Sequence, residues 1–99
     1  MMPWRGRRRG PRWISINPDI MMYGPIGRPP EGKIYVYLSE LEALRLVDVE
    51  NLTQEEAAQK IGISRKTLWT DLTRARSKII SAILNGYVIE IIPDIKENE

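Results

Sequence analysis

The chain has 99 residues, enough for one small domain with a single modest core. Its 42% hydrophobic and 28% charged residues are ordinary fractions for a globular protein. It has no cysteine and no histidine, which excludes disulfides, zinc sites built on thiolate or imidazole, and nucleophile–histidine catalysis. Its acidic residues do not cluster as a carboxylate site would, so we predict no enzyme, no metal, no cofactor and no small-molecule substrate.

The net charge of +2 conceals a segregation of charge along the chain. Residues 1–33 carry seven basic and two acidic side chains, and residues 64–84 carry five and one. Residues 34–63 carry two basic and six acidic side chains, and residues 85–99 carry one and four. Two basic blocks that alternate with two acidic blocks are typical of a protein that binds a phosphate backbone.

No apolar run approaches the ~20 residues of a membrane-spanning helix. The arginine-rich start is not followed by the apolar segment of a secretory signal, and its glycines and prolines would break the helix of an organellar transit peptide. We therefore expect no membrane association and a cytoplasmic, nucleoid-associated location.

Six of the seven prolines and five of the seven glycines lie in residues 1–32, so regular structure is not expected there. Residues 1–12 are predicted to form a basic flexible arm, and the more apolar residues 13–32 an ordered, irregular wrap against the domain. Flexible arginine arms enter the minor groove in several DNA-binding proteins, whereas the alternative is a solubilising tail. The arm residues predicted to contact nucleic acid are Arg5, Arg7, Arg8, Arg9 and Arg12.

Alternating β-branched and aromatic residues predict a strand over 33–38 and a second strand over 87–92. Pro93 ends the second strand, and residues 94–99 form an acidic tail. Two strands alone are marginally stable, so we expect a short two-stranded antiparallel sheet packed on the helices, or strand pairing across a dimer.

Three helices are expected from their capping signals. Ser39 and Glu42 have the spacing of a capping box, for a helix that ends near Asn51. Thr53 and Glu56 form a second box, for a helix that runs through Lys60.

Gly62 then stands where a tight turn needs a residue without a Cβ, and Ser64 caps a third helix that ends near Leu84. Ala58 is small where the next helix would cross, and Ile63 and Leu68 would fix that crossing. Residues 13–93 are thus predicted to contain a helix-turn-helix.

The helix over 64–84 is predicted to have one apolar face and an opposite face that is polar and cationic. The apolar positions are Leu68, Leu72, Ala75, Ile79, Ala82 and Ile83. Ile80 and Leu84 point away from that face, which suggests cover by the strands or by a second subunit, with burial in the monomer the simpler case.

In a helix-turn-helix, the N-terminal part of the second helix meets the bases in the major groove. The residues predicted to contact base edges are Arg65, Lys66, Thr70 and Thr73. The residues predicted to contact phosphates are Ser64, Arg74, Arg76 and Lys78. Trp69 lies at the edge of the apolar stripe, so we favour packing of its side chain in the core slightly over contact with a base.

Several runs resemble a known family. The chain is similar to a family of small uncharacterised archaeal and bacterial proteins to which DNA binding is attributed. The similar segments are the basic start, Tyr23 to Gly27, Leu41 to Leu46 with Asp48, Leu52 to Ala58, and Ile63 to Arg65. Separately, Thr67, Leu68, Leu72 and Arg74 to Ile79 resemble region 4 of sigma-70 factors.

This resemblance implies a sigma-region-4-like fold and DNA binding, with Arg65 and Lys66 at the recognition positions. The chain departs from its relatives in two places. Trp13 to Ile16 replace a segment where relatives often have cysteine, and Thr70 stands where they tend to have arginine. A metal or redox role and a relative's base preference are therefore not carried over.

Together these features predict a mainly α, trihelical helix-turn-helix domain whose function is sequence-specific binding of double-stranded DNA in transcriptional regulation. Two alternatives stay open. One is a protein-interaction module that binds a transcription component or forms a homodimer without DNA, for which Ile80 and Leu84 could serve. The other is RNA binding through the arginine arm.

Overall fold

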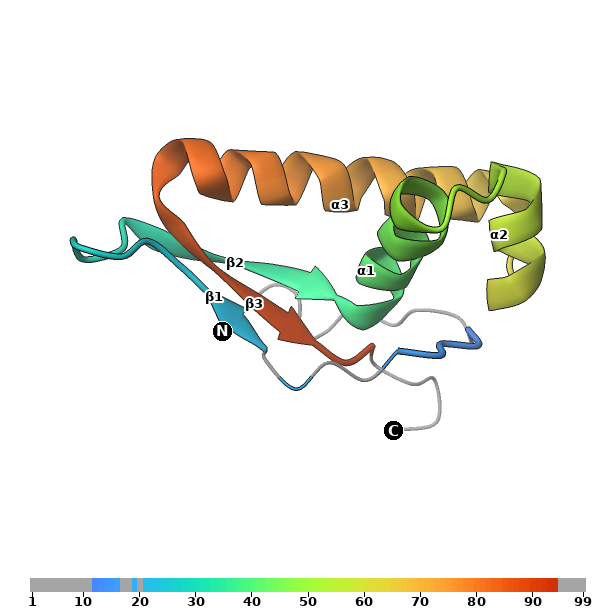
Figure 1. Cartoon of the computed structure of the whole chain (residues 1–99), viewed down its shortest axis with the longest axis horizontal. Helices are drawn as coiled ribbons and strands as arrows, with labels where there is room; N and C mark the ends of the chain where they lie inside the picture. Colours follow the sequence, from blue (N-terminus) through green and yellow to red (C-terminus); the bar gives the residue numbers. More distant parts are fainter. Residues whose placement is uncertain (1–11, 17–18, 20, 95–99) are drawn as a thin grey trace.

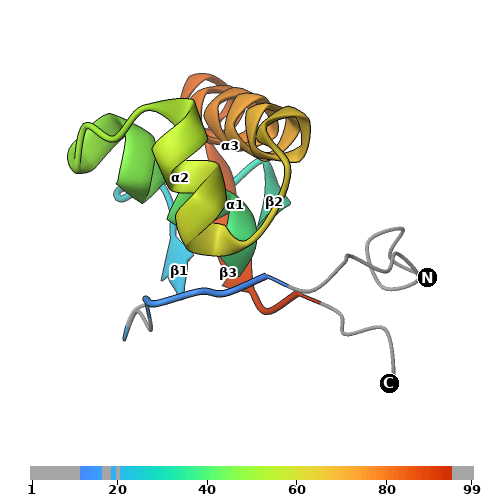
Figure 2. The same cartoon turned by 90° about the vertical axis from the view of Figure 1, so that its right-hand side faces the viewer.

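The structure, a computed structural model, describes residues 12–16, 19 and 21–94. In this part of the chain a three-stranded sheet lies against three α-helices. The elements are β1 (Met22–Tyr23), β2 (Gly32–Tyr37), α1 (Leu38–Leu44), the π-helical segment η2 (Arg45–Val49), α2 (Gln54–Ile61), α3 (Arg65–Asn85) and β3 (Tyr87–Ile92). Helix α3 lies along the sheet, with α1 and α2 at its N-terminal end (Figure 1). Seen from that end, the helices gather on one side of the sheet (Figure 2).

The sheet differs from the expected antiparallel pair. Its order is β1-β3-β2, and β3 pairs antiparallel with β1 but parallel with β2. The predicted antiparallel pairing of the two longer strands is therefore wrong. Three helices separate these strands in the chain, and a long helical connection allows the second strand to return in the same direction as the first. The short strand β1 comes from the segment expected to be irregular.

Helices α2 and α3 begin and end where the capping signals predicted. The Thr53 hydroxyl accepts a hydrogen bond from the Glu56 amide (3.1 Å), and the Glu56 carboxylate accepts one from the Thr53 amide (2.9 Å). Gly62 and Gly86 follow α2 and α3 with positive φ angles of 79° and 72°. Asn51 after η2 has a φ of 62°. Left-handed residues end these helical segments because their geometry stops the repeating hydrogen bonds.

Helix α1 begins one residue earlier than Ser39, so the predicted Ser39–Glu42 capping box is wrong. The Glu40 carboxylate instead accepts a hydrogen bond from the Tyr37 amide (2.9 Å). Ser39 lies in the first helical turn, where its amide has no intrahelical acceptor. The Asp94 carboxylate accepts from that amide (3.0 Å) and from the Ser39 hydroxyl (2.5 Å). Asp94, predicted as the first tail residue, therefore ties the segment that follows β3 to α1.

The core is a stripe along α3 that the other elements cover. Leu68, Leu72, Ala75 and Ala82 of α3 are buried as predicted, whereas Ile83 is 68% exposed. Ile80 and Leu84 are also exposed, so the predicted cover by the strands is wrong. Ala43, Leu46, Ala57, Ala58 and Ile61 form a buried cluster with Leu68 and Leu72. The strands β2 and β3 add the buried side chains of Val36 and Ile91.

A buried carboxylate ties the N-terminal segment to α1. Glu42 is 1% exposed, and its carboxylate accepts hydrogen bonds from the Ser15 hydroxyl (2.6 Å) and from Arg45 Nε (2.8 Å). Burial alone would raise the pKa of Glu42, but hydrogen bonds from Arg45 and Ser15 outweigh it and hold the pKa below its ordinary value of 4.5. The ionised form of Glu42 therefore stabilises the fold.

Replacing Glu42 by glutamine should lower the free energy of unfolding by about 2 kcal/mol at neutral pH, because charge-assisted hydrogen bonds are lost. Since folding lowers the pKa of Glu42, its contribution is present above pH 4.5 and is lost as the pH falls through the folded-state value. Urea unfolding of wild type and Glu42→Gln over a pH series should show the two curves converging in acid.

The matched control is Glu50→Gln. Glu50 is exposed and also faces Arg45, at 3.4 Å, so its loss should cost less than about 0.5 kcal/mol. A Glu42→Gln effect of the same size at every pH would contradict this role of the charge.

Candidate nucleic-acid interface

Helices α2 and α3 are joined by a turn of three residues. The Gly62 and Ile63 amides both donate to the Ala58 carbonyl (2.9 and 3.0 Å), which turns the chain directly at the end of α2. The Ser64 hydroxyl then accepts a hydrogen bond from the Thr67 amide (3.1 Å) and caps α3. Ala58 is buried, as predicted for the position where the two helices pack closely. The turn and the cap together fix the direction in which α3 begins.

Trp13 lies against this turn. Its amide donates to the Ile61 carbonyl (2.7 Å), and its ring passes so close to Gly62 that a Cβ there would be 2.9 Å from the indole. Gly62 is therefore needed for two reasons, its positive φ and the aromatic ring above it. Nothing in the local sequence indicated that Trp13 would meet the turn.

The N-terminal half of α3 presents a polar and cationic face. Arg65, Lys66, Trp69, Thr73 and Arg74 are exposed, and Thr70 is half-buried. Trp69 is 56% exposed, so its ring is available to a ligand rather than enclosed by the core. These residues, predicted separately to contact bases or phosphates, share one accessible helix surface.

Three cations on this surface have no ion-pair partner in the described part of the chain. Within residues 12–16, 19 and 21–94, no carboxylate lies at ion-pair distance from Arg65, Lys66 or Arg74. The one acidic residue in the first half of α3, Asp71, is only 2% exposed and points away from solvent. An exposed surface with unpaired positive charge and no accessible carboxylate attracts polyanions.

The two later cations of α3 are engaged by carboxylates. Arg76 Nη2 is 2.7 Å from Asp48, and this hydrogen bond raises the pKa of Arg76 and lowers that of Asp48. Lys78 Nζ is 2.7 Å from Glu40, whose side chain is fully buried. The Arg76 pair is exposed and easily exchanged, whereas moving Lys78 would leave a buried carboxylate without its cation.

Two threonine hydroxyls on the predicted contact face of α3 donate to the helix backbone. Thr70 donates to the Lys66 carbonyl (3.1 Å) and Thr73 to the Trp69 carbonyl (2.7 Å). Ser64 donates to the Thr67 hydroxyl (2.9 Å), so its side chain is occupied by the cap. The oxygens of Thr70 and Thr73 keep lone pairs that can accept hydrogen bonds from a ligand.

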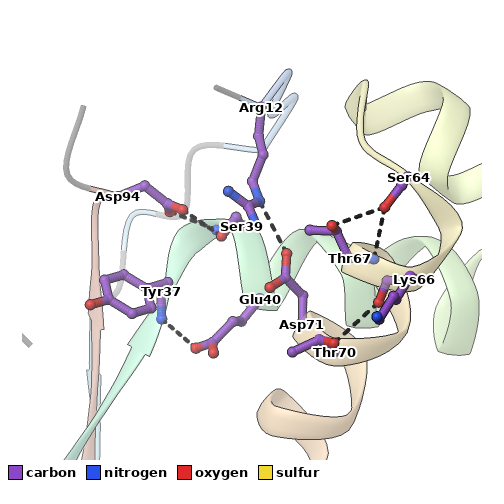
Figure 3. Close-up of polar contacts among 10 residues, drawn as sticks. All are labelled: Arg12, Tyr37, Ser39, Glu40, Ser64, Lys66, Thr67, Thr70, Asp71 and Asp94. Carbon is purple, nitrogen blue, oxygen red and sulfur yellow. Dashed lines mark hydrogen bonds and ion pairs between the residues drawn. The ribbon is translucent and has the colours of Figure 1, made fainter. Parts of the chain in front are cut away.

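A buried ion pair fastens the N-terminal segment to α3. Arg12 Nε is 3.0 Å from Asp71 Oδ2, and the two side chains are 8% and 3% exposed (Figure 3). Arg12 was predicted to belong to the flexible arm and to contact nucleic acid, yet here it holds the chain against the helix. Arg5, Arg7, Arg8 and Arg9 lie outside the described residues.

The comparisons with known proteins assign the chain to a family. It matches the family model "Protein of unknown function DUF134" over residues 2–95. The chain belongs to this family. A UPF0251 protein of Methanosarcina acetivorans is 47% identical over 93 residues, which cover 92% of this chain and 83% of that relative. A UPF0251 protein of Pyrococcus furiosus is 45% identical over 92 residues, covering 90% and 85%.

The expected resemblance to an uncharacterised archaeal family is thereby confirmed. A third member, the UPF0251 protein of Methanococcus maripaludis strain C7, is 42% identical over 90 residues, covering 88% of this chain and 68% of that relative. No solved structure matches the chain.

The described part of this DUF134 chain contains no group of three or more acidic side chains that could hold a metal ion. Among the same residues, no helix combines the length and apolar character needed to cross a membrane.

Substituting Gly62 by alanine should test the turn. The positive φ alone should cost about 1–2 kcal/mol of unfolding free energy, and the contact with the Trp13 ring should add about 1 kcal/mol or more. Gly27→Ala is the matched control, because Gly27 also has a positive φ (93°) but no atom within 4 Å of its added Cβ. Chemical unfolding gives both values.

In a Trp13→Ala background, the cost of Gly62→Ala should fall to that of Gly27→Ala. An unchanged cost in that background would show that Trp13 does not constrain the turn.

Proposed function

We propose that this protein binds double-stranded DNA sequence-specifically as a transcriptional regulator and not as an enzyme. In this proposal α2 and α3 form a helix-turn-helix like that of sigma region 4, and the first half of α3 enters the major groove. The proposal is carried by three exposed cations beside a tightly capped turn, Arg65, Lys66 and Arg74, which form no ion pair with any described residue.

The geometry of the first half of α3 suits this role. The major groove, about 12 Å wide, admits one α-helix, and its floor offers acceptors to arginine and lysine. Arg65 and Lys66 lie in the first turn of α3, the part that reaches base edges in this type of motif. Thr70 and Thr73 follow along the same side and can accept from base amino groups.

The presence or absence of an ion pair at each of the three later cations of α3 indicates how readily that cation could bind a phosphate. Arg74 has no ion-pair partner among the residues that the structure describes, so binding phosphate would break no such pair there. Arg76 would exchange an exposed pair with Asp48 for phosphate, at a cost of about 0–1 kcal/mol. Lys78 would have to leave the buried Glu40, so we place it last among the predicted contacts.

The Arg12–Asp71 pair supports a role for the arm. It starts the arm beside the first half of α3, so Arg5, Arg7, Arg8 and Arg9 have a fixed origin. Arg5, the farthest of these arginines, is seven residues from Arg12, so extended chain can place it up to about 25 Å away, which exceeds half of the ~34 Å of one duplex turn. The arm can therefore reach the minor groove that adjoins the bound major groove.

The first experiment selects bound fragments from random duplexes with wild type, Lys66→Ala and Arg74→Ala. Lys66→Ala should relax the preference at one or two base pairs, each worth about 1–3 kcal/mol. Arg74→Ala should weaken binding to all sequences alike. Lys60→Ala, an exposed cation on α2, is the control and should change neither property.

Binding that does not weaken as salt rises would contradict the proposal, because displaced counterions require that dependence. Stronger binding to single-stranded RNA than to any duplex would contradict it in favour of the RNA alternative.

A second experiment removes residues 1–11 and keeps Arg12, so that Asp71 stays paired. Affinity for all duplexes should fall by a similar factor, and the slope of log affinity against log salt should decrease in magnitude by up to about 4, one step of ~0.9 for each of four lost arginines. Fluorescence anisotropy at several salt concentrations measures both. An unchanged slope would mean that the arm is only a solubilising tail.

A further inference from the structure

The C-terminal end of α3 carries an exposed apolar surface, which we call the end patch. Its residues on α3 are Ile80, Ile83 and Leu84, exposed by 55%, 68% and 77%. Residues 79–85 contain no charged side chain, whereas residues 65–78 contain five basic ones. A contiguous exposed apolar surface on a small protein marks an interaction site.

The end patch includes both a hollow and a projection. The hollow has a volume of about 260 Å³ and is lined mainly by Tyr23, Pro25, Ala82, Ile83, Tyr87 and Ile89. Ile26 follows Pro25 in the β1–β2 connection and is 99% exposed. This connection projects beyond the C-terminal end of α3 (Figure 1). An exposed isoleucine thus directly follows, in the chain, a residue that lines an apolar hollow.

We propose that the end patch binds a second copy of this chain in a two-fold dimer, with Ile26 of each protomer in the hollow of its partner. A two-fold contact requires one surface to complement itself, and here the projection and the hollow lie on the same surface. Charge favours the same occupant. Two copies repel where α3 is basic, and the uncharged end of α3 is the part at which they can approach.

The position of the end patch also fits paired DNA sites, a step that rests on the DNA-binding function proposed above. The half of α3 that is proposed to enter the major groove is centred near Trp69, and the end patch is centred near Ala82. The distance between these two points along the helix is about 20 Å. Two such lengths joined at the patch come to about 40 Å, and inclining the two helices toward each other brings their N-terminal halves nearer to the ~34 Å that separates successive major grooves on one side of the duplex.

Sedimentation equilibrium of the full chain tests the dimer. The wild type should have twice the mass of one chain at micromolar concentration, and Ile83→Glu and Ile26→Asp should each raise the dissociation constant by about tenfold or more, because a charge would enter the apolar contact. Ile26 lies outside the secondary structure and is fully exposed, so its variant tests the contact without disturbing the fold. Val49→Glu is the control, since Val49 on η2 is 68% exposed, as is Ile83, and lies outside the end patch.

A monomeric wild type at 100-fold higher concentration would overturn the proposal and leave the end patch to a different protein. A dimer that survives both patch variants would overturn it as well. DNA-binding measurements distinguish a failure of the dimer proposal from a failure of the DNA-binding proposal. Ile83→Glu should bind a single half-site as the wild type does but lose cooperative binding to paired half-sites. A wild-type dimer that binds no DNA would refute only the DNA-binding function.

Discussion

Helix α3 buries only one side of its surface, and the other helices and the sheet all pack against that side. Leu68 and Leu72 pack in the cluster formed with α1 and α2, and the sheet lies against the later turns. The sides that remain exposed then differ along the helix, because the first half is cationic and the last two turns are apolar. One helix thus has an exposed cationic surface in its first half and an exposed apolar surface in its last two turns.

The buried carboxylates each bind a particular cation, and this pairing determines which cations on α3 have no partner among the described residues. Glu40 and Glu42 are buried and bind Lys78 and Arg45, while Asp71 on α3 binds Arg12. Each buried carboxylate takes a cation, because an unpaired charge in the interior is costly. Arg65, Lys66 and Arg74 remain without such a partner among the described residues, which concentrates the accessible positive charge at the turn.

The parts of the structure that depend on local chemistry could be predicted. Thr53, Ser64, Gly62 and Gly86 act within a few residues of themselves, so their types alone indicate where α2 and α3 begin and end. Contacts between distant segments could not be predicted. The parallel pairing of β2 with β3, the Ser39–Asp94 hydrogen bonds and the Arg12–Asp71 pair each depend on the finished packing. The same limit explains Ile83, whose position on the helix wheel suggested burial, although the strand residues near it leave its side chain 68% exposed.

The central claim is that the first half of α3 is the surface that meets DNA. Titrating the isotope-labelled protein with a duplex taken from selected fragments and following the backbone amide resonances tests this claim most directly. The largest shifts should fall on residues 62–74, with small changes on η2 and on the exposed end of α3 if the protein is already dimeric. Shifts centred on residues 80–87 or on the sheet, with residues 64–74 unchanged, would contradict the claim.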